Sequence, residues 1–121
     1  MTTFTNEALL PLTTYGTPSG NYNGTTPFFF GNSVPAANFY AGAGFGQTVL
    51  IQITGFQGNI TLQGSLNDWH EQAMWFDIEK VEVPDADTTA LTLNVEGNFV
   101  WLRAFVEDFA AGTINTANVI Y

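Results

Sequence analysis

The stretch between residues 48 and 66 constrains the fold of this chain most, because branched side chains alternate there with mostly polar ones. The alternation is interrupted at Gly55-Phe56-Gln57-Gly58 and then resumes. Alternation with a period of two is typical of a β-strand that has one face in a core and the other in solvent. Two such strands around a glycine-containing turn predict a β-hairpin. The predicted inward residues are Val49, Ile51, Ile53, Ile60 and Leu62.

The rest of the second half has the same character. We expect four more strands, at residues 75–83, 91–96, 99–109 and 113–121, with turns at 84–87 and 97–98, a break at Gly112 and one helical turn at 67–74. Short strands at regular spacing predict an all-β fold, namely an antiparallel β-sandwich or jelly roll. Leu91, Leu93, Leu102 and Ala104 complete the predicted core.

The first 46 residues differ from the remainder. They contain four prolines, seven glycines and nine aromatic residues, but a single charged residue, Glu7. Prolines and glycines at this density exclude a long helix and allow short extended pieces between turns. We therefore predict an extended N-terminal arm at 1–46, with a flexible joint at 42–46, followed by a sandwich domain at 47–121. The aromatic rings of the arm must lie either on the chain's own sheet or on a neighbouring subunit.

Charge restricts the partners of the chain. The formal net charge is −9, and Lys80 and Arg103 are its two strong cations. A field of this sign repels a nucleic-acid backbone and an anionic lipid surface, and no run of about 18 apolar residues is present to span a bilayer. The absence of cysteine excludes disulfides and thiolate metal sites.

Candidate catalytic and metal-binding residues are few. Asp77 and Glu79 share a strand face, but paired carboxylates on a solvated strand are typical of surface charge. His70 has no second histidine to share a zinc ion, and residues 85–87 (Asp-Ala-Asp) lack the further acidic ligands of a calcium loop. No serine lies in a nucleophile elbow. We expect no enzymatic activity, no cofactor and no metal.

The predicted strand 99–109 carries aromatic residues on the face opposite its aliphatic row. Trp101 and Phe105 flank Arg103 on that face. A strand that is apolar on both faces is covered on both faces, so either the arm or a partner subunit lies over it. Arg103 could alternatively form an ion pair with Glu96 or Glu107. Because aromatic residues and arginine are enriched at interfaces, we predict that the interface residues are Phe28, Phe29, Phe30, Phe39, Tyr40, Trp101, Arg103 and Phe105.

Four short segments of the second half together resemble a known group of proteins. They are GNITLQGSLND at 58–68, WFDI at 75–78, GNFVWLRAFV at 97–106 and AGTI at 111–114. Their order is similar to that in small jelly-roll domains of tailed-phage virion proteins, where a Gly-Ser turn precedes a tryptophan-containing strand, an arginine-containing strand and a Gly-Thr hairpin. The resemblance covers residues 47–121.

This resemblance implies a structural component of a phage particle that assembles in the host cytoplasm. The favoured role is a capsid decoration protein that binds the major capsid protein, or other virion proteins, as an oligomer on the lattice. A neck, tail or fibre module is an alternative. Sandwiches of this kind also occur in carbohydrate-binding modules, so recognition of a host-surface glycan through Trp69 or exposed aromatic residues is a second hypothesis.

Overall fold

The computed structural model describes residues 6–35, 47–65, 75–95 and 101–120 of the chain. Within these ranges the fold is all-β and contains no helix. The same ranges contain no helix that is long and apolar enough to cross a bilayer. The seven strands of the described residues belong to one open antiparallel sheet, which confirms the predicted all-β class and the antiparallel direction.

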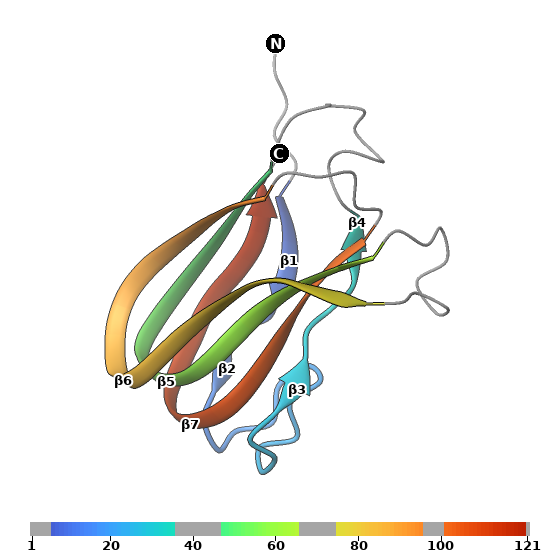
Figure 1. Cartoon of the computed structure of the whole chain (residues 1–121). Helices are drawn as coiled ribbons and strands as arrows, with labels where there is room; N and C mark the ends of the chain where they lie inside the picture. Colours follow the sequence, from blue (N-terminus) through green and yellow to red (C-terminus); the bar gives the residue numbers. More distant parts are fainter. Residues whose placement is uncertain (1–5, 36–46, 66–74, 96–100, 121) are drawn as a thin grey trace.

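Three long strands form most of this sheet. They are β5 (Gln47–Ser65), β6 (Phe76–Val95) and β7 (Trp101–Ile120), with β5 between the other two. Each strand bends sharply near its middle, so that its two limbs face each other (Figure 1). A single hydrophobic cluster contains buried residues from both limbs of all three strands. The concave side of the bent sheet is therefore the core.

The bend of β5 corrects the predicted hairpin. Gly55 and Gly58 have positive φ angles of 59° and 154°, and the pairing register with β6 and β7 shifts around them. These glycines redirect the strand without reversing it. The two predicted hairpin strands consequently do not pair with each other: Ile53 pairs with Thr89 and Ile114, and Ile60 pairs with Val81 and Val106.

Two other predicted interruptions also lie inside continuous strands. Residues 84–87 form the bend of β6, and Gly112, with a φ of 86°, lies at the bend of β7. The predicted turn at 84–87 and the predicted break at Gly112 are therefore wrong as strand boundaries. Pro84 is tolerated within β6 because β6 is an edge strand, where a missing N–H need not interrupt the ladder. The predicted helical turn at 67–74 and turn at 97–98 lie outside the described residues.

The N-terminal part of the chain forms the other edge of the sheet. Its strands β1 (Asn6–Leu10), β2 (Thr13–Thr14), β3 (Phe29–Phe30) and β4 (Val34–Pro35) all pair with β7 and follow it from its C-terminal to its N-terminal end. The described part of the predicted arm is thus integrated into the sheet of the same chain and does not extend away from it. The predicted joint at 42–46 lies outside the described residues.

This N-terminal segment also joins the two limbs of the bent sheet. The Asn32 N–H donates to the Leu9 carbonyl over 2.8 Å, and the Gly31 N–H donates to the Ala104 carbonyl over 2.7 Å. Gly31 is required at this crossing, because a Cβ atom there would lie 2.3 Å from the Leu9 carbonyl oxygen. The core is therefore closed on this side by the chain's own backbone.

An aromatic cluster fills the core at the bend. Phe109 contacts Phe56, Phe29 and Tyr22, with ring centroids 5.5, 6.1 and 5.3 Å away. The Tyr22 hydroxyl accepts a hydrogen bond from the Gly16 N–H over 2.9 Å. The excursion of the chain between β2 and β3 thus supplies a ring that covers the end of the core.

The predicted core is confirmed at eight of its nine positions, and the ninth is partly buried. Leu91 packs against the core but keeps some exposure. The eight buried residues are Val49, Ile51, Ile53, Ile60, Leu62, Leu93, Leu102 and Ala104.

Candidate interaction surface

Three of the predicted interface residues come together on the outer face of the sheet. Phe30 of β3 pairs in register with Phe105 of β7, and their rings stack with centroids 4.5 Å apart and an interplanar angle of 23°. Arg103 precedes Phe105 by two residues and therefore lies on the same face. Phe30 retains 40% of its accessible surface, so the group is open to solvent.

Arg103 is the centre of this group. Its guanidinium carbon lies 4.0 Å from the ring centroid of Phe30 and 4.2 Å from that of Trp75. Two aromatic rings at these distances stabilise a cation through their quadrupoles. The Arg103 Nε–H also donates to the Gln63 Oε1 over 2.8 Å. Partial burial lowers the pKa of Arg103 below its usual range. An arginine side chain is nevertheless charged at neutral pH.

A row of side chains continues across the sheet from Arg103. Gln63 of β5 lies opposite both Arg103 and Asp77 in the strand register, and its Nε2 donates to the Asp77 Oδ1 over 2.9 Å. The row therefore connects β7, β5 and β6 on one face. We name Phe30, Gln63, Trp75, Arg103 and Phe105 the aromatic surface.

The alternatives for Arg103 are now resolved in part. Among the described residues, no carboxylate lies within the 4.0 Å ion-pair distance of its guanidinium, and Glu107 instead lies 3.9 Å from Lys80. Glu96 is outside the described ranges. The cover on this face comes from the chain's own Phe30 and Trp75, which shield the guanidinium without hiding the group from solvent.

The other predicted interface residues are distributed differently. Phe29 is 5% exposed and belongs to the chain's own core, which corrects the expectation that it contacts another subunit. Phe28 is 56% exposed. Trp101 is partly exposed and lies two residues before Arg103 on the same face. Phe39 and Tyr40 lie outside the described residues.

Sequence reasoning missed Trp75 and Gln63 as members of the surface. Trp75 is the first residue of a predicted strand, and Gln63 occupies a polar position of the central alternation, so neither residue stands out locally. Their position became apparent only from the register, which places β5 between β6 and β7. An outward residue on a central strand necessarily has a neighbour on each side.

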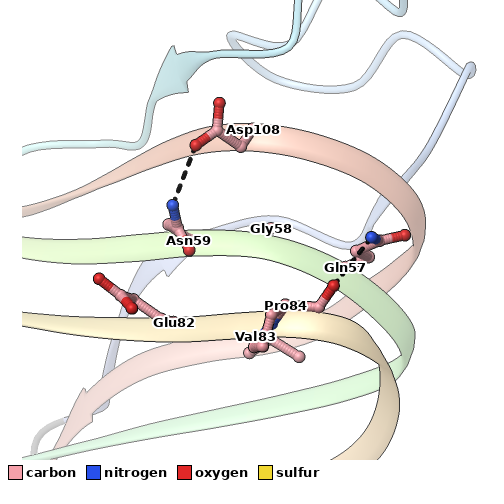
Figure 2. Close-up of a pocket in the computed structure, with 7 residues that line it drawn as sticks. All are labelled: Gln57, Gly58, Asn59, Glu82, Val83, Pro84 and Asp108. Atoms are coloured by element: carbon pink, nitrogen blue, oxygen red, sulfur yellow. Dashed lines mark hydrogen bonds between the residues drawn. The ribbon is translucent and has the colours of Figure 1, made fainter.

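A second group of polar residues lies in a shallow hollow at the bend (Figure 2). There the Asn59 Nδ2 donates to the Asp108 Oδ2 over 3.0 Å, and the Gln57 Nε2 donates to the Pro84 carbonyl over 2.9 Å. These bonds connect β5 to β7 and to β6, so the amides of the hollow hold adjacent strands together where the ladder is irregular. We assign them a structural role.

The candidate catalytic and metal-binding residues that the structure describes do not form a common site. In the described part of the chain, no group of three or more His, Asp or Glu side chains could hold a metal ion. Asp77 accepts a hydrogen bond from Gln63 at the border of the aromatic surface, and Asp85 and Asp87 are exposed at the bend of β6. His70 and Trp69 lie outside the described residues.

The chain was compared with protein-family models, curated proteins and solved structures, and none of the three comparisons found a match.

Proposed function

We propose that this chain is a non-enzymatic structural protein of a tailed-phage virion. In this proposal it is a capsid decoration protein that adopts a jelly-roll type of sandwich and binds the major capsid protein through the aromatic surface. The observation that carries the proposal is the Arg103 guanidinium held between the rings of Phe30 and Trp75 on a solvent-accessible sheet face. The order of the four sequence segments supports the phage assignment.

The geometry of the aromatic surface favours binding to a protein. Tryptophan and arginine are the residues most enriched in interface hot spots, and phenylalanine is enriched in the buried part of interfaces. Stacking between two rings and the hydrogen bond to Gln63 hold the long Arg103 side chain in place before a partner arrives. A preordered side chain loses less rotamer entropy on binding, which leaves more of the contact energy for affinity.

The partner should offer an acceptor to Arg103 and apolar area to the rings. A guanidinium has five N–H donors, and the Nε–H is the one that bonds to Gln63. The remaining donors suit a carboxylate or a cluster of backbone carbonyls on a capsid subunit. The repeated subunits of a lattice would then place many copies of the chain next to each other. The proposal includes no nucleic-acid or membrane partner.

A binding experiment with particles tests this proposal. Purified chain is added to capsids assembled without it, and the bound fraction is measured by sedimentation. Replacement of a hot-spot residue costs about 2 kcal/mol or more, so Arg103→Ala should weaken binding by about 30-fold. The matched control is Leu12→Ala, which truncates a hydrophobic side chain that is 61% exposed and does not belong to the aromatic surface, and it should have little effect. Equal binding by Arg103→Ala and wild type would refute the proposed surface.

A role in the neck, tail or a fibre uses the same surface with a different partner. Antibody labelling of complete particles, viewed by electron microscopy, separates these positions. Label distributed over the head supports decoration, whereas label confined to the tail assigns the chain to that structure.

Glycan recognition is the second candidate, favoured by exposed rings beside an amide and a carboxylate. Sugars stack on free ring faces, but the guanidinium of Arg103 occupies one face of Trp75. The glycan hypothesis therefore predicts that Arg103→Ala keeps or improves binding to a glycan array. The assembly hypothesis predicts no glycan binding by either protein.

A further inference from the structure

Among the described residues, β6 has the longest unpaired edge of the sheet, because the opposite side is formed by the short strands β1 to β4. β6 is terminal in the strand order and pairs with β5 alone. In an antiparallel ladder, alternate residues of such a strand direct their N–H and C=O groups away from the sheet. The edge is thus a template for one additional strand.

The core is also less covered on this side. Three hydrophobic residues pack against the core while remaining partly exposed, and all three belong to β6: Ile78, Val81 and Leu91. Val81 and Leu91, from opposite limbs of β6, line one hollow together with Val83 and Thr89. An apolar side chain or the aliphatic part of a longer one could enter between the limbs.

Charge divides β6 into two limbs of different character. Residues 76–87 contain five carboxylates, Asp77, Glu79, Glu82, Asp85 and Asp87, and one cation, Lys80. Residues 88–95, which we name the neutral limb, contain neither charge nor proline. Charges and prolines on an edge discourage strand addition, and the neutral limb lacks both. Pairing should therefore occur on the neutral limb.

The acidic residues at the bend define the partner. Glu82, Asp85 and Asp87 line the same hollow as Val81 and Leu91, and the three carboxylates are exposed whereas the two aliphatic side chains are partly buried. We call these carboxylates the rim of the hollow. An apolar hollow with an acidic rim complements a lysine or arginine, because such a side chain has an apolar stem and a cationic end. A second copy of the chain would instead bring a second acidic β6 to the same place, where like charges repel.

We propose that the neutral limb of β6 accepts an extended strand from a partner protein, and that this strand carries a lysine or arginine that enters the hollow at the β6 bend. Backbone hydrogen bonds would supply affinity, as in other cases of strand addition, and the basic residue would supply specificity. This surface is separate from the aromatic surface, so the inference does not depend on the proposed function.

The test uses the full chain and two synthetic peptides observed by NMR titration. The first peptide, Thr-Val-Thr-Lys-Thr-Val-Thr, has a central lysine, and the second has glutamate in its place. At low salt the lysine peptide should bind about tenfold more tightly, with amide shifts concentrated in residues 88–95 and around Val81. The double substitution Asp85→Asn and Asp87→Asn should reduce this preference to about twofold, because the rim loses two charges.

The matched control changes the same number of charges elsewhere on β6. Asp77→Asn with Glu79→Gln should leave the lysine preference close to that of the wild type, because neither residue lines the hollow. Absence of binding, equal binding of both peptides, or shifts confined to the aromatic surface would overturn the proposal. Shifts in residues 88–95 that appear on concentrating the chain alone would show that a second copy is the occupant, and would overturn it as well.

Discussion

The two sides of the sheet differ in how the edge of the outermost long strand is covered. Along β7, four short strands of the N-terminal segment cover the edge, and residues of that segment such as Leu9 and Val34 are 0% and 5% exposed. Along β6 no described strand covers the edge, and Leu91 and Val81 are partly exposed. We refer to these as the closed edge and the open edge.

This difference indicates that the two edges have different roles. The closed edge uses a segment rich in glycine, proline and aromatic residues, which can follow an irregular path and still fill the core. On the open edge, the charges of residues 76–87 discourage pairing with another strand, whereas the neutral limb has no such charges. Stability therefore depends on the closed edge, and the capacity for strand addition is left to the open one.

Removal of the closed edge is expected to have the largest effect. Deletion of residues 1–35 removes Leu9, Leu10, Tyr22, Phe29 and Val34 from the core. Burial of each such side chain contributes about 1.5–3 kcal/mol, and the sum is comparable to the whole stability of a domain, about 5–15 kcal/mol. Thermal denaturation followed by near-ultraviolet circular dichroism should show no cooperative transition. A cooperative transition close to that of the full chain would show that residues 36–121 fold alone.

Equivalent truncations on the two edges should differ in cost. Leu9→Ala should lower the free energy of unfolding by about 2–5 kcal/mol, since Leu9 is fully buried. Leu91→Ala removes the same atoms from a partly exposed site and should cost about 1 kcal/mol. Urea denaturation of both variants measures the difference. Equal losses would mean that the open edge is as well covered as the closed one.

A single methyl group at the closed edge should have a smaller but measurable effect. Gly31→Ala places a Cβ against the Leu9 carbonyl oxygen and the Leu10 side chain, and we expect a loss of about 2–3 kcal/mol. Gly55→Ala is the matched control, because no atom lies within 4 Å of a Cβ there and the cost is the positive φ of 59°, about 1 kcal/mol. The same urea titration ranks the two variants, and a reversed order would contradict the crossing at Gly31.

Local patterns predicted the content of the strands but not their ends. The alternation in residues 48–66 correctly assigned Val49, Ile51, Ile53, Ile60 and Leu62 to the core. The alternation could not distinguish a hairpin from a bend, because glycines with positive φ occur in both. The two differ in which strands the flanking segments pair with, and this is a property of the tertiary structure. Gly112 misled the prediction for the same reason, and Pro84 misled it because a proline can also lie within an edge strand.

The prediction of the aromatic surface was incomplete, because the members of this surface lie far apart in the sequence. Arg103 and Phe105 share a strand face, which alternation reveals, and Phe30 belongs to the segment that had to cover something. The sequence left open whether that cover was internal. The structure answered this question for Phe29, which is buried in the chain itself. It also placed Trp75, which directly precedes β6, over Arg103.

Hydrogen exchange of backbone amides, measured by NMR on the full chain, tests the contrast between the two edges most directly. The Gly31 and Asn32 amides donate to Ala104 and Leu9 inside the closed edge and should exchange only through global unfolding. On the neutral limb, about every second amide between residues 88 and 95 should exchange rapidly, because it faces outward from an unpaired strand. Uniform protection along residues 88–95 in the monomer, or rapid exchange at Gly31 and Asn32, would contradict this account.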